Sequence, residues 1–390
     1  MPTGETLLHI LFVSHSFPPE NNFLENLGGM QRVAMELYDA LCRLQPAVKV
    51  SGHILRTSWK QTTLRTPPFL LRSLHTLPRR VHREYVSVLL FSSMVTATLA
   101  PLLKKRLPSL PMATILHGQD VTFPFAPYQR YLPHVFRTLD AVFPVSHATG
   151  QQAIQRGAFP DRVHVIPNGI NLQRVRFCAR RSLCRQQLLQ HFPKAARTFP
   201  RNGFLLCSVG RQVKRKGFHW FIEEVMPHLP EHVHYWLAGD GPMHNSLARA
   251  IHKHHLDHRV HLLGRVTEDA LHLLYRGSDV FVMPNIPVPG DMEGFGVVML
   301  EAGLAGLPVI ASKLEGIADV IKEGANGHLL PPLQAKAFQQ AILRYVYQPD
   351  RLEQLSRQAH AYVRTHFSWD AIAQQYVAHL TGLVTGAQAT

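Results

Sequence analysis

Residues 278–306 read SDVFVMPNIPVPGDMEGFGVVMLEAGLAG and contain one complete strand, loop and helix. The apolar run 280–283 predicts a short buried strand, and the proline- and glycine-rich residues after it predict a loop. An apolar helix begins near Val297 and continues to Gly306. A strand followed by a helix is the repeating unit of parallel α/β proteins.

The same alternation occurs along the whole chain, so we expect an α/β fold with one doubly wound parallel sheet in each half. We place the boundary between two Rossmann-like domains after a basic segment, which gives domains 1–200 and 201–368. Residues 369–390 contain an amphipathic helix that we expect to cross back onto the first domain. The expected strands are 7–13, 48–55, 86–91, 112–116, 141–145 and 163–166, then 204–209, 233–238, 260–263, 280–283, 309–311 and 328–330.

Composition supports two folded domains with anionic partners. The chain has 390 residues, 46% of them hydrophobic and only 17% charged, which is outside the composition of disordered proteins. The 41 Lys and Arg residues exceed the 26 Asp and Glu residues by 15, so the net charge is +15. The stretch 86–103 has no charge, but a buried strand followed by a helix explains it better than a membrane span, because it contains five Ser or Thr residues and Pro101.

The first residues and the cysteines favour a cytoplasmic protein. The N-terminus lacks the charge order of a secretory signal. Four cysteines are too few and too irregularly spaced for a disulfide framework or a zinc site, so we expect them to be reduced.

The loop and helix in the opening stretch carry the most informative motif. Gly294 and Gly296 allow close backbone approach, and the helix after them directs unpaired amide groups at a phosphate. Glu301, on the second helical turn, can accept both hydroxyls of a ribose, while Glu293 can accept hydroxyls of a sugar. Alternatively, a helix cap and one glutamate exposed to solvent, with no bound ligand, would explain the same spacing.

Two further strand ends carry candidate residues. Arg211 offers a planar fork to a diphosphate and Lys216 a point charge, each beside a glycine, Gly210 and Gly217. A basic surface turn is the alternative. His117 follows the strand 112–116 and could hold a substrate hydroxyl, although most of the 25 histidines must be structural or exposed.

Other motifs point away from cofactors and metals. Gly239-Asp240-Gly241 begins like a dinucleotide fingerprint, but His244 stands at the third glycine position, so a nicotinamide cofactor is disfavoured. The acidic triplet 291–293 and the histidines between 252 and 261 are weak metal signals without a second set of ligands. We therefore expect no cofactor and no required metal.

Taken in order, these motifs resemble the family 4 glycosyltransferases, whose GT-B architecture has two Rossmann-like domains facing across a cleft. Glu315-Gly316 departs from the usual Gly-Gly of the family, and Asn171 replaces its usual Asp. The matching motifs are Gly28-Gly29, His117-Gly118, Pro144-Val145-Ser146, Ile166-Pro167-Asn168-Gly169-Ile170, Gly210-Arg211, Lys216-Gly217, Gly239-Asp240-Gly241-Pro242, Leu263-Gly264, the pair Glu293 and Glu301 with seven residues between them, Asn326-Gly327 and Phe367-Ser368-Trp369.

The resemblance implies roles for these residues. The first domain would bind the acceptor and the second the nucleotide sugar, a UDP- or GDP-sugar. The expected catalytic residues are His117, Arg211, Lys216 and Glu293, and the expected donor-binding residues are Gly28, Gly29, Gly210, Gly264, Gly294, Phe295, Gly296 and Glu301.

The sequence thus predicts a retaining, metal-independent hexosyltransferase that moves a sugar to a lipid-linked or polysaccharide acceptor of the cell envelope. Its basic charge favours a peripheral position at the inner face of the membrane. One alternative is a soluble glycosyltransferase acting on a small metabolite or phosphosugar. Another, from a different class, is a non-catalytic nucleic-acid- or anion-binding protein; only the charge suggests it, and no nucleic-acid-binding motif is present, so we expect no nucleic-acid partner.

Overall fold

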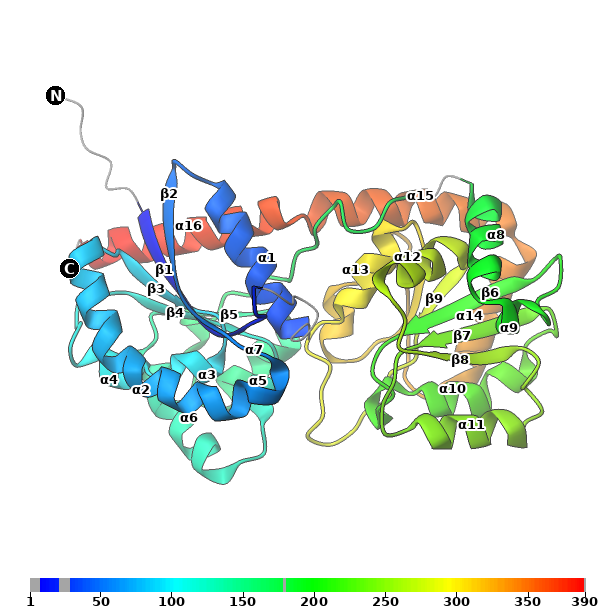
Figure 1. Ribbon diagram of the computed structural model, residues 1–390, viewed down its shortest axis with the longest axis horizontal. Helices are drawn as coiled ribbons and strands as arrows, with labels where there is room; N and C mark the ends of the chain where they lie inside the picture. The colour runs from blue at the N-terminus through cyan, green and yellow to red at the C-terminus, as the bar shows by residue number, and fades with distance from the viewer. Residues whose placement is uncertain (1–7, 21–28, 178–179, 389–390) are drawn as a thin grey trace. The chain divides into compact units, whose positions relative to one another are not determined.

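The computed structural model of the protein describes residues 8–20, 29–177 and 180–388. The chain forms two compact units, one of residues 1–169 together with 369–390, and one of residues 170–368 (Figure 1). Each unit contains one parallel sheet with helices packed on it, so the prediction of two doubly wound α/β domains is confirmed.

The first unit has a five-stranded parallel sheet in the order β2-β1-β3-β4-β5. The strands are β1 (Leu8–Phe17), β2 (Val48–Arg56), β3 (Val88–Phe91), β4 (Met112–Leu116) and β5 (Ala141–Pro144). The helices are α1 (Gly29–Arg43), α2 (Trp59–Glu84), α3 (Met94–Ala97), α4 (Ala100–Lys104), α5 (Gln119–Thr122), α6 (Ala126–Thr138), α7 (His147–Ile154) and α16 (Trp369–Gln388).

The prediction of a sixth strand at residues 163–166 is wrong. His164 and Ile166 donate backbone hydrogen bonds to Val142 and Pro144 at 2.9 and 3.1 Å, but only an isolated bridge forms, between Val142 and Val163. Pro144 has no N–H group to return a bond, so this ladder cannot continue as a regular strand pair.

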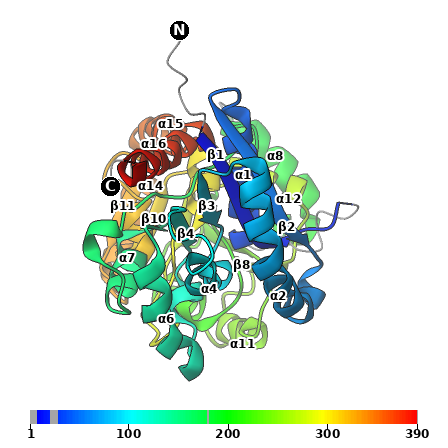
Figure 2. The ribbon, with the colours of Figure 1, turned by 90° about the vertical axis from the view of Figure 1, so that its left-hand side faces the viewer.

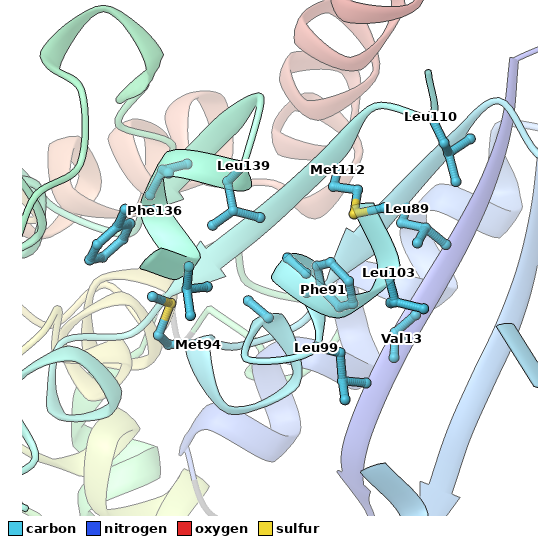
Figure 3. Close-up of a cluster of buried hydrophobic side chains, with 14 of the residues drawn as sticks. Val13, Leu89, Phe91, Met94, Leu99, Leu103, Leu110, Met112, Phe136 and Leu139 are labelled. Atoms are coloured by element: carbon cyan, nitrogen blue, oxygen red, sulfur yellow. The ribbon is translucent and has the colours of Figure 1, made fainter. Parts of the chain in front are cut away.

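The uncharged stretch 86–103 supplies part of the first core. It forms β3, α3 and the start of α4, and the side chains of β3 are all buried. No helix in the described part of the chain is long and apolar enough to cross a membrane. Figure 3 shows the cluster that this stretch helps to build, which includes Val13, Leu89, Phe91, Met94, Leu99, Leu103, Leu110, Met112, Phe136 and Leu139.

Helix α16 belongs to the first unit and packs against α1 (Figure 2, where α16 is the red helix). The indole Nε1 of Trp369 donates to Glu36 at 2.5 Å, and Arg43 pairs with Asp370 at 2.8 Å. Tyr376, which is buried on α16, makes an edge contact with Phe143 of β5. The end of the chain therefore completes the fold of its beginning.

The second unit has a six-stranded parallel sheet in the order β11-β10-β9-β6-β7-β8. The strands are β6 (Phe204–Val209), β7 (Val233–Ala238), β8 (Val260–Gly264), β9 (Val280–Met283), β10 (Val309–Ser312) and β11 (Gly327–Leu330). The helices are α8 (Arg181–His191), α9 (Pro193–Ala196), α10 (Phe218–Glu224), α11 (His244–Lys253), α12 (Glu268–Gly277), α13 (Val297–Leu304), α14 (Ala335–Tyr347) and α15 (Pro349–His366).

The boundary between the units lies at residue 170, not at residue 200 as we expected. Helix α8 packs on α12, where a side chain on Gly277 would meet Leu188 at 2.8 Å. Arg185 pairs with Asp279 at 2.7 Å and donates to the Gly203 carbonyl at 3.2 Å. The basic composition that resembled a linker thus reflects arginines that bind α8 to the second unit.

One expectation about the cysteines is also wrong. Cys42 and Cys207 are free, but Cys184, which is buried on α8, is disulfide-bonded. Spacing along the chain could not indicate this bond, because a disulfide depends on the distance between the two residues in the fold.

Candidate active site

The sheet of the second unit reverses its winding direction at β6. From β6 the chain proceeds to β7 and β8 on one side, and then crosses to β9, β10 and β11 on the other. Open parallel sheets bind ligands beyond the carboxyl ends of the strands at such a switch point. The loops that follow β6 and β9 are those that carry Arg211, Lys216 and Glu293.

Glycine geometry brings these two loops together. Gly217 has a φ of +67°, and a Cβ atom there would lie 1.9 Å from the carbonyl oxygen of Pro284. The 3₁₀ turn Lys214–Lys216 can therefore pack directly on the loop after β9 only because residue 217 has no side chain. The backbone N–H of Ile286 donates to the Arg215 carbonyl at 2.9 Å and fixes the contact.

A buried carboxylate lies at the centre of the joined loops. Glu293 Oε2 lies 2.6 Å from Lys216 Nζ, 3.3 Å from Asn285 Nδ2 and 3.5 Å from Arg215 Nε. Arg215 also pairs with Asp291 at 3.3 Å. Two cations and an amide thus face one carboxylate, which is an arrangement suited to a charged ligand.

Opposing effects act on the ionisation of Glu293. Burial raises the pKa of the carboxyl group, but Lys216, Arg215 and the Asn285 amide outweigh burial, so its pKa is lowered. Glu293 is therefore ionised at neutral pH. Sequence reasoning missed Arg215, which stands beside Lys216, and Asn285, which lies eight residues before Glu293.

Glu301 lies on the second turn of α13 and is 3% exposed. Its Oε1 accepts from Arg174 Nε at 2.8 Å and its Oε2 from the Tyr275 hydroxyl at 2.9 Å. Burial raises the pKa of Tyr275 well above its usual value, and the charge of Glu301 adds to this rise, so the phenol remains a donor. Each carboxylate oxygen has a second lone pair, so acceptance of ribose hydroxyls stays a prediction.

Sequence reasoning also missed Arg174 and Tyr275. No local motif marks them, because they reach Glu301 from 127 and 26 residues away along the chain. Only the fold brings them to α13.

The loop before α13 contains a glycine with a positive φ and a close backbone contact. Gly296 has a φ of +87° and precedes the first residue of the helix, whose opening amide groups have no partner within the helix. Gly294 packs against Gly316, where a Cβ atom would lie 2.0 Å from the Gly294 carbonyl oxygen. Phe295 is buried.

The remaining predicted residues of the second unit lie at strand ends. Arg211 is exposed, and no ion pair of its side chain occurs within the described ranges. Gly210 follows β6 and donates its N–H to Ala238 at 3.0 Å. Gly264 ends β8, two strands from β6, and its carbonyl accepts from Gly239 at 2.7 Å. A Cβ atom on Gly239 would lie 2.0 Å from the Gly210 carbonyl oxygen, so Gly239 connects Gly264 to the loop after β6 that carries Lys216.

In the first unit, His117 follows β4 and is held from two sides. Its backbone N–H donates to Asp120 Oδ1 at 2.9 Å, and its Nε2 lies 2.8 Å from the Ser92 carbonyl oxygen. A carbonyl only accepts, so Nε2 carries a proton, and in the tautomer with a single proton on Nε2 the Nδ1 atom is an acceptor. This arrangement suits a hydroxyl ligand.

A second histidine in this region was missed. His15 lies at the end of β1, is 5% exposed, and has its Nδ1 3.4 Å from Ser93 Oγ. Burial, with a smaller effect of His117, lowers the pKa of His15 to about 4. The available signal was the polar run 14–16, which directly follows the apolar run 10–13 of the same strand.

The first glycine motif is only partly described. Gly28 lies outside the described residues, and Gly29 is the first residue of α1 and is exposed. Over the described ranges, no group of three or more His, Cys, Asp or Glu side chains is placed to hold a metal ion.

Comparisons with known proteins identify the class. Residues 203–348 match the family described as "Glycosyl transferases group 1", and residues 27–174 match "Glycosyltransferase Family 4". The chain belongs to the family 4 glycosyltransferases, which have the GT-B fold.

Two similar glycosyltransferases share about a quarter of their aligned residues with this chain. A putative colanic acid biosynthesis glycosyltransferase, WcaL of Salmonella typhimurium, is 26% identical over 68% of this chain and 62% of its own length. A GDP-mannose-dependent alpha-(1-6)-phosphatidylinositol monomannoside mannosyltransferase of Mycobacterium tuberculosis is 23% identical over 96% of this chain and 98% of its own. The first relatives are matched over less than two thirds of their length, from 43% to 64%.

A solved structure shares the fold. Anabaena Alr3699/HepE in complex with UDP and glucose matches 96% of this chain and 100% of its own with a TM-score of 0.72 and 19% identity.

Proposed function

We propose that this chain is a retaining, metal-independent glycosyltransferase that moves a sugar from a nucleotide diphosphate donor to a lipid-linked or polysaccharide acceptor. The observation that carries the proposal is the buried Lys216–Glu293 pair at the switch point of the second sheet. Lys216 and Arg211 neutralise the departing diphosphate, and the amide groups at Phe295 and Gly296 hold it.

The roles of Glu301, Glu293 and His117 follow from their positions in the fold. Glu301 accepts the ribose hydroxyls, and Glu293 accepts hydroxyls of the transferred sugar. In the first unit, which binds the acceptor, His117 offers an acceptor nitrogen to a substrate hydroxyl. The leaving phosphate assists deprotonation of the acceptor on the same face, so the reaction needs no separate base.

The donor is a UDP- or GDP-sugar, and the acceptor belongs to the cell envelope. Support comes from the names of similar proteins: one solved relative holds UDP and glucose, one relative depends on GDP-mannose, and another is named for colanic acid biosynthesis. The test is hydrolysis of UDP-glucose, UDP-galactose and GDP-mannose by the purified chain. Nucleotide release from none of them, with no nucleotide binding, would contradict the proposal.

Metal independence rests on the cations of the site. Arg211, Lys216 and the start of α13 supply positive charge where a bound ion would otherwise act. We expect the hydrolysis rate to remain unchanged in saturating EDTA. A large loss that magnesium or manganese restores would show that a metal is required.

We also propose that the first unit attaches to an anionic membrane surface through α2. The helix exposes Leu64 and Leu71, which are 79% and 67% exposed. Two other apolar residues of α2 are less available for this contact, because Phe69 stacks on His53 and Leu70 packs against the core. The exposed basic residues of α2 are Lys60, Arg65, Arg72, Arg79 and Arg83.

Liposome sedimentation tests the attachment. Each cation near an anionic surface contributes about 1 kcal/mol, and salt screens the attraction. Binding should require anionic lipid and fall as salt rises. Equal recovery with neutral vesicles would remove the membrane surface from this proposal.

A further inference from the structure

Glu315 has an unusual backbone conformation next to the Glu293 loop. It is the first residue of the 3₁₀ turn Glu315–Asp319, which follows β10, the neighbour of β9 in the sheet. Its φ is +49°, in the left-handed region that residues other than glycine seldom adopt. A strained residue persists only where its surroundings hold it, and such residues gather at functional sites.

Two hydrogen bonds to the backbone of Glu293 hold the turn in place. The Oε2 of Glu315 accepts from the Glu293 N–H at 2.5 Å, and the Gly316 N–H donates to the Glu293 carbonyl at 3.1 Å. Gly316 lies so close to the Gly294 carbonyl that a Cβ atom would meet it at 2.0 Å. The carboxyl group of Glu315 is thus fixed beside the residue that binds the donor sugar in the proposed function.

One carboxyl oxygen of Glu315 remains available to bind a ligand. The Oε2 atom is used by Glu293, whereas Oε1 has no hydrogen bond to any described residue, and the side chain is half-buried. Burial raises the pKa of Glu315; the Glu293 N–H and Arg215 oppose the rise, and the charges of Glu293 and Asp291 add to it. A carboxyl group in this setting is well suited to a hydroxyl ligand and poorly suited to a phosphate.

We infer that Glu315 is a specificity-determining residue of the donor site and binds a hydroxyl group of the transferred sugar through Oε1. The inference rests on the proposed function and extends it to a residue at which this chain departs from its family. Like charge excludes the diphosphate as the partner of Glu315, and the ribose is assigned to Glu301 on the second turn of α13. The sugar ring is the remaining part of the donor that offers hydroxyl donors.

The test compares nucleotides with and without a sugar. Glu315→Gly is suited to it, because glycine adopts a φ of +49° without strain and the variant should stay folded. Calorimetry on the full chain would use UDP, GDP, UDP-glucose, UDP-galactose and GDP-mannose. We expect the affinity for the bare nucleotides to remain within about twofold, and that for the preferred nucleotide sugar to fall about 10-fold, the loss typical of a hydrogen bond to a charged group.

Controls separate the outcomes. Lys313→Ala removes an exposed charge from the same loop and should change neither affinity. Glu315→Gln, which keeps an acceptor oxygen, should retain part of the preference between sugars. Equal loss for nucleotides and nucleotide sugars, or no loss for either, would overturn the inference. A wild-type chain that binds none of the five compounds would instead contradict the proposed function itself.

Discussion

Lys216 Nζ lies 2.6 Å from Glu293 Oε2, and the two side chains are only 8% and 11% exposed. Removing one partner of a buried pair leaves the other charge uncompensated, which costs about 3–5 kcal/mol when nothing else faces it. Here Arg215 and Asn285 also face Glu293, so part of the compensation would remain after loss of Lys216.

Lys216→Met should therefore damage both catalysis and stability. We expect turnover in donor hydrolysis to fall by a factor of about 100 to 1,000, the usual effect of losing a group that stabilises transition-state charge. The free energy of unfolding should fall by about 2 kcal/mol, less than for a wholly isolated charge. Lys214→Met, in the same turn but exposed, is the control. Near-normal turnover in Lys216→Met would refute the role of this residue.

The lowered pKa of Glu293 makes its contribution to stability depend on pH. The contribution is fully present above the unfolded pKa of about 4.5 and is lost as pH falls through the lower folded pKa. Glu293→Gln should thus reduce the free energy of unfolding at pH 7 but bring it closer to that of the wild type in more acidic solution. Urea denaturation at pH 7, 5 and 4 measures this. A constant difference at all three values would show that the carboxylate charge is not the cause.

The fold was largely predictable from the sequence, because short apolar runs and glycine turns are local signals. The unit boundary was not, since α8 is joined to the second unit by Arg185 and Asp279, which are 94 residues apart. The same limit applies to the site. Lys216 and Glu293 stand in recognisable motifs, whereas Tyr275, which binds Glu301, has no motif that marks it.

Glu301 and Glu293 should differ in their effects on nucleotide binding. Glu301→Gln should weaken the affinity for UDP or GDP about 10-fold, because a ribose contact is made equally in the ground and transition states. Glu293→Gln should leave that affinity nearly intact while harming transfer. Tyr275→Phe controls for the lost internal hydrogen bond and should change stability by about 1 kcal/mol with little effect on binding. If calorimetry gave Glu301→Gln and Glu293→Gln the same nucleotide affinity, their roles would not be separate.

His15 should make the first unit sensitive to acid. Its pKa of about 4 lies below the usual 6.5, so the unfolded chain takes up a proton before the folded one does. The resulting stability is present above pH 6.5 and is lost as pH falls toward 4, by about 3 kcal/mol in total. His15→Gln should flatten this part of the pH profile. His53 and His234 have similarly lowered pKa values and remain in this variant. We therefore expect the free energy of unfolding to depend less steeply on pH, but not to become independent of it. An unchanged slope would contradict the assignment of acid sensitivity to His15.

Gly217 should be indispensable for joining the two loops of the site. Gly217→Ala would place a Cβ atom 1.9 Å from the Pro284 carbonyl oxygen, so the turn that carries Lys216 would have to shift. Gly264 also has a φ of +67°, but a Cβ atom there would meet nothing within 4 Å. Gly264→Ala therefore measures the backbone strain alone, about 1 kcal/mol, without the clash. We expect Gly217→Ala to lose at least about 3 kcal/mol of unfolding free energy and most donor hydrolysis, as for other severe backbone clashes. Equal losses of stability in the two variants would show that residue 217 must be glycine because of backbone strain, and not because a Cβ atom would clash with the neighbouring loop.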